Sequence, residues 1–498
     1  MKKLNKKING RSRLSRLSLC AMLLLLFFVY SITSCKKFVD IPPPITKLVT
    51  PSVFNNNAAA TSAVTNIYTQ MYANSESPSM ASYNGLLADE LTFYGTGNVA
   101  FFSYINAMNS SSYYGPWQTA YKYIYQANAV IAGLQQYSGA SPAVKQQLTG
   151  EAYFIRAFWH FYLTDCYGAV PLVLTTDYTV NSTLQRSPRL QVLTQVITDL
   201  QTAQGLLSNN YVDASDTITT TDRVRPNKYV ASALLARAYL YRGDYSNNNS
   251  TDYASAAAAA SFVINNSAEY SLCTNLSGTN SVFLENSNEA IWQLYTPLPA
   301  KINTYDGADF ILLAAPVGQS AISPQLLNSF EPGDQRKVNW VGSITKGANT
   351  YYFPYKYKVQ TGGTNISEYT MVLRLAEQYL IRAEAKAEQG DATAVNDLNI
   401  IRNRASLPNY TGATDKASLL TTIQHERQVE LFTEWGHRWF DLNRAANTAS
   451  TVNVNTVMGS PGNVCQFKGG TWAAYKALYP IPQAEITLDN KLTQNPGY

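Results

Sequence analysis

Apolar residues recur at intervals of three and four along much of this chain, a spacing that places them on one face of a helix. The clearest stripe holds Ala152, Ile155, Trp159 and Tyr162, and Gly168 is expected to end that helix. Further helices are predicted over residues 58–72, 121–137, 188–207, 226–241, 252–264, 373–387 and 392–405. The pattern therefore predicts a mostly α-helical protein.

Small residues recur within two of these helices, at Ala236 and Ala238 and again at Ala383, Ala385 and Ala387. Because a methyl side chain lets a neighbouring helix approach closely, the helices are expected to stack in pairs, as in tetratricopeptide arrays. No clean repeat of about 34 residues can be aligned. The array is predicted over residues of about 52–268 and 367–445.

Three stretches interrupt the helical pattern. Residues 75–115 are rich in glycine, asparagine, serine and aromatic residues, and residues 270–366 contain six prolines. Residues 446–498 are also predicted to be irregular. An insertion as long as residues 270–366, formed of loops and short strands, is expected to have a function.

The N-terminus reads as a bacterial lipoprotein signal peptide. Basic residues at positions 2, 3, 6, 7, 11, 13 and 16 precede an apolar run at 19–29, which is short for a membrane span of about 20 residues. We interpret residues 1–34 as a cleaved signal peptide, Cys35 as a lipidated N-terminus and residues 35–51 as an extended, proline-containing tether. A simple secretory peptide and an uncleaved anchor are the alternatives.

The charge balance changes once the leader is set aside. The chain has 38 basic and 33 acidic residues, a net charge of +5. Removing the leader's seven basic residues leaves 31 basic and 33 acidic residues, a net charge of −2, so no nucleic-acid partner is indicated.

The cysteines and aromatic residues bear on other points. Cys166, Cys273 and Cys465 are too few and too widely spaced for a disulfide framework. The 35 tyrosines, 18 phenylalanines and 7 tryptophans leave aromatic rings available for a binding face.

Several segments together resemble the SusD/RagB family, the surface lipoproteins that partner TonB-dependent transporters in Bacteroidetes. In chain order they are GEA at 150–152, RAF at 156–158, YGAVPL at 167–172, RPNK at 225–228, LARAYL at 235–240, LRLAE at 373–377, RAEA at 382–385, NIIRNRA at 399–405, ERQVEL at 426–431, RWFDLNR at 438–444, PIP at 480–482 and QNPGY at 494–498. They extend over nearly the whole length that follows the leader.

The resemblance implies a fold of tetratricopeptide-like helix pairs with an irregular lobe, residues 270–366, that carries the ligand. It implies a non-enzymatic protein that is anchored by lipid in the outer membrane. We predict neither a cofactor nor a metal site, and calcium binding stays open. The implied partners are an oligosaccharide or peptide and a SusC-like TonB-dependent transporter. Lys36 and Lys37 stand where many surface-exported relatives have acidic residues, so outward and periplasmic orientations both stay open.

The shared motifs themselves are expected to be structural. Charged residues recur every three or four positions through the last two helical motifs, where opposite charges can pair along a helix or with its neighbours. They are Glu426, Arg427, Glu430, Glu434, Arg438, Asp441 and Arg444. We expect the same role for Arg156, Arg237 and Arg382.

Catalytic and metal motifs were also considered. A glycosidase needs two apposed carboxylates, and the loop candidates are Asp89 with Glu90 and Asp306 with Asp309, which are otherwise solvated or turn-forming acids. Calcium at Asp306 and Asp309 is possible but unsupported. The pair at 425–426 is followed by valine where a zinc protease motif needs its second histidine.

A sugar site combines aromatic rings, which stack on the apolar faces of sugars, with amide, carboxylate or guanidinium partners for the hydroxyls. Two segments have this composition, 93–104 and 292–310, and both match the regions that form the ligand face in SusD-like proteins. The predicted ligand-binding residues are Tyr94, Asn98, Phe101, Trp292, Tyr295, Tyr305, Asp306 and Phe310. Trp292 lies in an alternating run that could equally be a strand with this ring packed inside.

The leading hypothesis is a lipoprotein that captures nutrients and passes them to a transporter. The alternative from another class is a helical scaffold that binds protein segments only.

Overall fold

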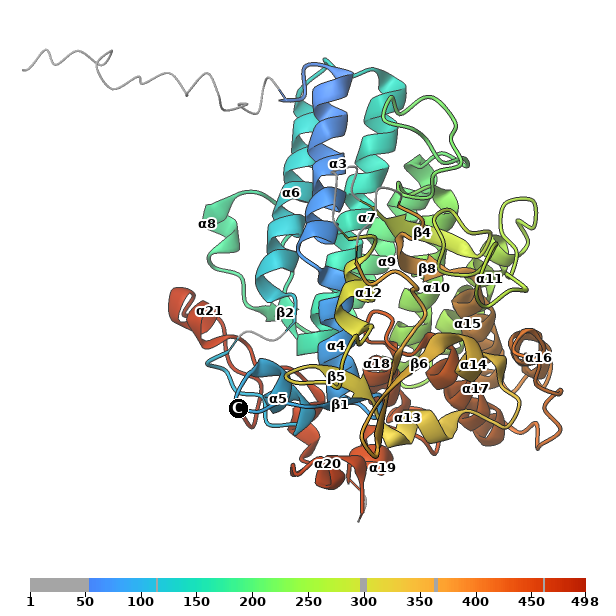
Figure 1. Cartoon of the computed structure of the whole chain (residues 1–498). Coiled ribbons are helices and arrows are strands. Elements are labelled where there is room, and N and C mark those ends of the chain that lie inside the picture. The colour runs from blue at the N-terminus through green and yellow to red at the C-terminus, as the bar shows by residue number, and fades with distance from the viewer. Residues whose placement is uncertain (1–52, 113–114, 296–301, 362–365, 460–461) are drawn as a thin grey trace, which may run out of the picture. The chain divides into compact units, whose positions relative to one another are not determined.

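Helices make up most of the part of the chain that the computed structural model describes, residues 53–498 without 113–114, 296–301, 362–365 and 460–461 (Figure 1). The expectations for the signal peptide, Cys35 and the tether lie outside the described residues. Among those residues, no helix combines the length and apolar character needed to cross a bilayer.

The long helices pack in chain order, so that each contacts the next (Figure 1). They are α3 (Asn57–Ala73), α6 (Trp117–Gln136), α7 (Pro142–Tyr167), α9 (Arg189–Leu206), α10 (Lys228–Tyr245), α11 (Ser250–Ile264), α15 (Leu375–Glu388), α16 (Ala394–Arg404), α17 (Lys416–Leu431) and α18 (His437–Ala445). The predicted end of α7 is correct: Gly168 follows it with a φ of 75°, a conformation that glycine adopts without strain. Helix α15 packs directly on α11, so the intervening residues leave the stack unbroken.

The stretch between α11 and α15 contains short helices and most of the strands. They are β4 (Ala290–Leu294), α12 (Tyr305–Phe310), β5 (Ser320–Ile322), α13 (Pro324–Ser329), α14 (Gln335–Trp340), β6 (Val341–Lys346), β7 (Asn349–Pro354) and β8 (Thr370–Arg374). Strand β4 pairs antiparallel with β8, and β6 with β7. Two further strands, β2 (Val170–Pro171) and β3 (Arg186–Ser187), pair beside the four-residue helix α8 (Tyr178–Asn181).

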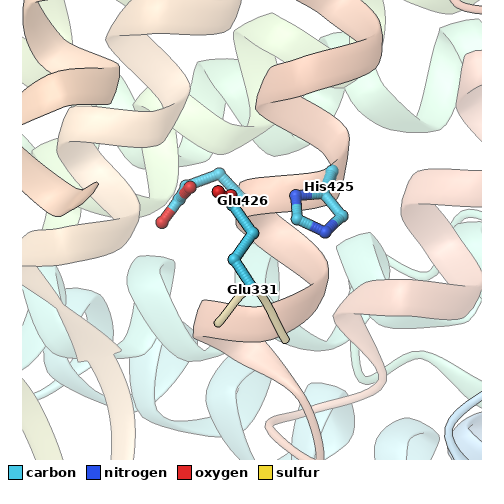
Figure 2. Close-up of side chains that lie close together, drawn as sticks. All are labelled: Glu331, His425 and Glu426. Carbon is cyan, nitrogen blue, oxygen red and sulfur yellow. The ribbon is translucent and has the colours of Figure 1, made fainter. Parts of the chain in front are cut away.

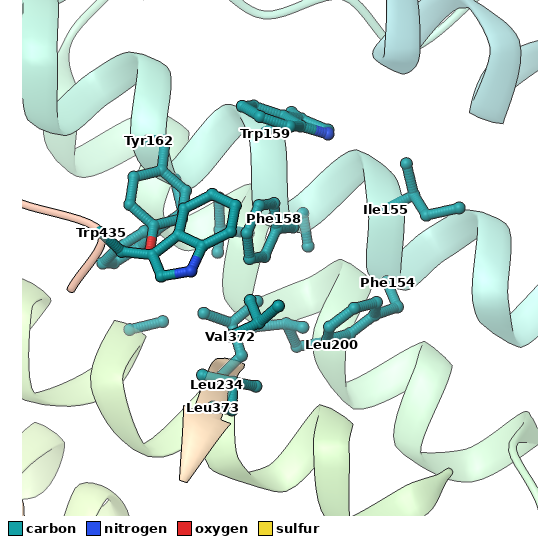
Figure 3. Packing of buried hydrophobic residues seen from close by; sticks show 14 of the residues in the cluster. Phe154, Ile155, Phe158, Trp159, Tyr162, Leu200, Leu234, Val372, Leu373 and Trp435 are labelled. Atoms are coloured by element: carbon teal, nitrogen blue, oxygen red, sulfur yellow. The ribbon is translucent and has the colours of Figure 1, made fainter. Parts of the chain in front are cut away.

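The largest apolar cluster joins α7 to its neighbours through aromatic rings (Figure 3). Phe154 and Phe158 of α7 contact the ring of Trp292 edge-on, with centroid distances of 5.0 and 5.4 Å. Trp435 packs against Phe158 from the other side, at 5.3 Å. Such edge-to-face contacts add about 0.5–1.5 kcal/mol each beyond simple burial. These contacts join α7 to β4 and to the segment between α17 and α18.

Two helices lie where residues 75–115 were predicted to be irregular: α4 (Glu76–Leu87) and α5 (Val99–Tyr104), joined by strand β1 (Leu91–Phe93). The prediction was wrong there because serine, proline, glycine and asparagine give α4 a poor intrinsic propensity. Packing overrides it: nine of the twelve residues of α4 are buried. Residues 446–498 contain only short helices: α19 (Val454–Gly459), α20 (Val464–Phe467), η2 (Ala474–Ala477) and α21 (Gln483–Leu488).

All three cysteines of the described part, Cys166, Cys273 and Cys465, are buried and free. No disulfide framework is present among these residues, as the spacing predicted.

Candidate functional site

A pocket of about 300 Å³ lies between α4, β1 and the stretch from α12 to β5. Its lining residues are Pro78, Ser79, Ser82, Tyr83, Phe93, Ala100, Ala308, Asp309, Phe310, Gly318, Gln319 and Ser320. We call it the α4–α12 pocket. It combines three aromatic rings with hydroxyl, amide and carboxylate groups, the chemistry that a sugar needs.

An antiparallel pairing between strands far apart in the sequence holds the two walls together. Leu91 of β1 lies opposite Ile322 of β5, and Phe93 lies opposite Ser320. Beyond the strands, the N–H of Tyr94 donates to the carbonyl of Gln319 at 2.9 Å. Figure 1 shows α12 and β5, in yellow, beside α4 and β1, in blue. Phe93 of the first predicted segment and Phe310 of the second therefore line one pocket, together with residues 318–320, which lie beyond the second segment.

Buried apolar rings form the base of this pocket. Phe93 and Phe310 belong to one buried cluster with Leu86 and Leu91 of the α4–β1 segment. The backbone comes close here: a β-carbon at Gly95 would lie 2.7 Å from the ring of Phe93. A side chain at this position would force the ring of Phe93 to shift, so glycine suits this close approach.

Acidic groups dominate the electrostatics of this region. Burial raises the pKa of Asp306 to about 7, although hydroxyls of Ser77 and Thr370 donate to its carboxyl at 2.7 and 3.0 Å. Burial raises the pKa of Tyr83 as well, and the charge of Asp309 adds to that shift. Asp306 is thus a buried hydrogen-bonding group, whereas Asp309 is an exposed acid on the pocket wall.

The predicted residues of the first segment lie next to the pocket. Tyr94 is 39% exposed and its ring contacts that of Tyr351 edge-on at 5.3 Å. Asn98 is exposed but caps α5, because its side-chain oxygen accepts from the N–H of Phe101 at 2.9 Å. Phe101 is half-buried and packs against the cluster that contains Phe93.

The second segment is divided among three environments. Phe310 lines the α4–α12 pocket, while Asp306 is only 3% exposed beneath it, which contradicts a direct ligand contact. Tyr305 is half-buried and packs against Tyr72 at a centroid distance of 5.3 Å. The prediction for Trp292 was wrong: its ring is 0% exposed, and its indole N–H donates to the carbonyl of Val224. The strand alternative is the correct one.

Tyr295 lies in a separate pocket of about 330 Å³, between α3 and residues 212–225. Its ring stacks on that of Tyr369 at a centroid distance of 4.6 Å. Arg225 also lines this pocket, but Glu151 and Asp216 already pair with its guanidinium. The structure therefore does not bring Tyr295 together with Phe310.

Ser79, Ser82 and Tyr83 of α4 line the α4–α12 pocket and were not singled out from sequence. They follow one another at intervals of three and one, which places all three on a single face of a helix. That signal was present, but it only becomes readable once residues 76–87 are recognised as helical.

The family motifs are structural, as expected. Their charged residues are buried and pair mostly between elements: Arg438 with Asp89, Arg374 with Glu434, and Arg444 with Glu384. The arginines of the earlier motifs behave alike, since Arg156 pairs with Asp199, Arg237 with Glu377 and Arg382 with Asp397. Only Arg444 and Asp441 pair within one helix among the described residues.

Asp89 and Glu90, one of the two pairs considered for hydrolysis, are buried rather than solvated, whereas in the other pair Asp306 is buried and Asp309 is exposed. Arg438 lowers the pKa of Asp89 although burial opposes it. Burial and the neighbouring Asp89 raise the pKa of Glu90 to about 8. Both residues lie inside the protein, at 5% and 1% exposure, away from any surface where a polymer could bind.

Glu331, His425 and Glu426 are gathered closely enough to suggest a metal site (Figure 2). One ligand atom from each lies within 4.8 Å of the others. Arg402, however, pairs with Glu331 at 2.6 Å, and Arg336 pairs with Glu426 at 2.6 Å. Nε2 of His425 lies 2.8 Å from a backbone carbonyl, which can only accept, so this nitrogen is a donor. The cluster is therefore an ion-pair network and does not fit a cation.

Comparisons with known proteins agree with this architecture. A crystal structure of a SusD superfamily protein from Bacteroides vulgatus matches with a TM-score of 0.71 and 22% identity, over 89% of this chain and 100% of that one. The fold is the mostly helical, tetratricopeptide-like fold of the SusD superfamily.

Family models cover most of the sequence. A model described as SusD family matches residues 333–498, and one described as "Starch-binding associating with outer membrane" matches residues 37–240. "SusD-like protein P2" of Formosa agariphila is 26% identical over 431 residues, 77% of this chain and 80% of that protein. "Starch-binding protein SusD" of Bacteroides thetaiotaomicron is 31% identical over 132 residues, 26% of this chain and 21% of that protein. The chain belongs to the SusD/RagB family.

Proposed function

We propose that this protein is a non-catalytic lipoprotein that captures oligosaccharides in the α4–α12 pocket. Cys35 would anchor it to the outer membrane, facing outward, and a SusC-like TonB-dependent transporter would receive the cargo. The observation that carries the proposal is the lining of the pocket, where the rings of Tyr83, Phe93 and Phe310 lie among hydroxyl and amide groups from both walls.

The names of relatives support the same class of ligand, since one is a starch-binding protein and one family model is described as starch-binding. The pocket wall at residues 308–320 lies between the two matched ranges, 37–240 and 333–498. Family membership therefore leaves the particular glycan open.

Capture for delivery calls for modest affinity, because the cargo must leave again. Millimolar binding corresponds to about −4 kcal/mol. One stacked ring and a few hydrogen bonds in a pocket of about 300 Å³ are enough for that.

The proposal is tested by replacing one ring. Tyr83→Ala removes an aromatic face and a hydroxyl from the pocket, and we expect the dissociation constant for a bound oligosaccharide to rise about five- to tenfold. Calorimetric titration of residues 52–498 measures it, with the glycan first identified on an array. Tyr295→Ala is the matched control, because it removes the same ring type from the other pocket.

A fold that is intact by circular dichroism together with unchanged glycan binding in Tyr83→Ala would contradict the site. Conversion of the glycan to shorter products by the purified protein would contradict the non-catalytic role. Binding of protein segments alone would favour the scaffold alternative.

A further inference from the structure

We propose that the α4–α12 pocket selects uncharged glycans over those that carry carboxylates, with Asp309 as the residue that enforces the choice. This inference rests on the proposed function and specifies the class of its ligand. Among the described residues that line the pocket, Asp309 is the one with a charged side chain.

The Asp309 carboxylate is available to a ligand. It is exposed, and none of the ion pairs in the described part of the chain involves it. A carboxylate accepts hydrogen bonds from sugar hydroxyls, which donate as well as accept. An ionised carboxylate on the ligand can only accept hydrogen bonds. It would therefore be repelled by the like charge of Asp309 and could form no hydrogen bond with it.

Two further acids lie near this wall, and burial raises the pKa of each to about 7, so each is only partly ionised at neutral pH and neither offsets the charge of Asp309. Asp306 lies in the same helix and is tied to Ser77, the residue just before the lining residue Pro78. Glu76 lies in the first turn of α4. Neither acid is paired with a lysine or arginine among the described residues.

None of the described lining residues is basic. Lys468 is buried and donates to the backbone carbonyls of Leu86 and Leu87, at the opposite end of α4 from the pocket. The positive end of the α4 dipole does face the pocket side, with a partial charge of about +0.5. Glu76 lies at that end, and the full charge of Asp309 outweighs what remains.

The remaining polar groups are neutral. Hydroxyls of Ser79, Ser82 and Tyr83 and the amide of Gln319 can donate to and accept from sugar hydroxyls without favouring a charge. Two unit charges about 6 Å apart near a protein surface repel enough to weaken binding about threefold or more at low salt.

The test compares each neutral oligosaccharide with its own acidic derivative. A panel of glucan, mannan and galactan oligosaccharides is titrated against residues 52–498, each beside the form in which its primary hydroxyls are oxidised to carboxylates. We expect wild type to bind the neutral member at least about threefold more tightly at low salt, with a smaller difference in about 0.5 M salt. Asp309→Asn should reduce the difference, and Asp309→Lys should reverse it.

Asp391→Asn is the matched control, because Asp391 is an exposed acid on the turn between α15 and α16. It should leave the preference unchanged. Equal or tighter binding of the oxidised members by wild type would overturn this inference while leaving glycan capture in place. Failure of both sets to bind would overturn the proposed function, and this inference with it.

Discussion

The carboxyl group of Asp306 is buried, and only 3% of this residue is exposed. Both carboxyl oxygens accept hydrogen bonds from hydroxyls, at 2.7 Å from Ser77 and 3.0 Å from Thr370. Because neutral donors offset only part of the cost of burying a charge, the folded protein favours the protonated form, and the pKa rises to about 7.

This shift gives a pH-dependent stability. The folded-state pKa of Asp306 lies above its unfolded value near 3.8, so its stabilising contribution is complete below that value and is lost as the pH rises to about 7. Asp306→Asn is neutral at every pH. We expect the unfolding free energy of this variant to match that of wild type near pH 4 and to exceed it by about 2–4 kcal/mol near pH 8.

Urea unfolding at both pH values measures the difference between variant and wild type. Subtracting the unfolding free energy of wild type at each pH cancels the contribution of other acids with raised pKa values, such as Glu76 and Glu90. A difference that does not change with pH would show that Asp306 stays ionised in the fold.

At the scale of single residues, the sequence could identify side chains suited to binding a sugar, but it could not show which of them are exposed. Trp292 and Tyr295 are three positions apart and equally suited to a sugar, yet one is the centre of the core and the other lines a surface pocket. Strand alternation left both faces of β4 possible, and only tertiary packing by α7 decides between them.

Helix α5 shows how one polar side chain positions an element beside the pocket. The side chain of Asn98 accepts from the N–H of Phe101, and α5 carries the lining residue Ala100. A short helix has few internal hydrogen bonds, so the cap matters more to it than to a long one.

Asn98→Ala should therefore loosen α5 by about 1 kcal/mol, because the first-turn N–H groups lose their acceptor. Hydrogen exchange at Phe101 and Phe102 is the measurement, with faster exchange expected there and no change in the amides of α7. Asn98→Asp keeps a hydrogen-bond acceptor, so the amides of Phe101 and Phe102 should exchange as slowly in this variant as in wild type. Equal protection of these amides in Asn98→Ala would contradict a stabilising role for the cap.

At the scale of elements, the long helices could be predicted because their apolar spacing is regular and their ends carry clear signals, as Gly168 does for α7. Helix α4 could not, since its residues favour turns and it becomes helical only when α18, α12 and β1 enclose it. The pocket was therefore only partly predicted. Phe93, Ala100 and residues 308–310 lie in the two segments expected to bind the ligand, and residues 318–320 lie in the expected lobe, whereas the lining residues from α4 were not expected.

A network of buried charges joins the far parts of the molecule. The carboxylate of Glu430 in α17 forms ion pairs with three arginines. They are Arg336 of α14, with an N···O distance of 3.0 Å, Arg374 of β8, at 2.5 Å, and Arg404 of α16. Three guanidinium groups lower its pKa well below the usual value, although burial opposes them. Sequence indicated that these motif residues pair, but their partners come from other elements and could not be assigned from helix spacing.

Glu430→Gln removes the charge that these three arginines share while keeping the shape. We expect a loss of about 3–5 kcal/mol of unfolding free energy, because breaking a buried pair leaves uncompensated charge in a dry interior. Thermal and urea unfolding measure it. Lys386→Met is the control: this lysine pairs with Asp397 at 2.9 Å but is 26% exposed, so a loss of about 1 kcal/mol or less is expected. Similar losses for both variants would contradict a special role for the network.

The pocket wall at residues 308–320 takes no part in that network: none of the ion pairs in the described part of the chain includes a residue of this stretch. The wall proposed to contact the ligand is thus separate from the buried ion pairs that join the helices. Substitutions in this wall can change the ligand preference proposed for it without breaking those ion pairs, the condition under which one scaffold can accommodate many different ligands.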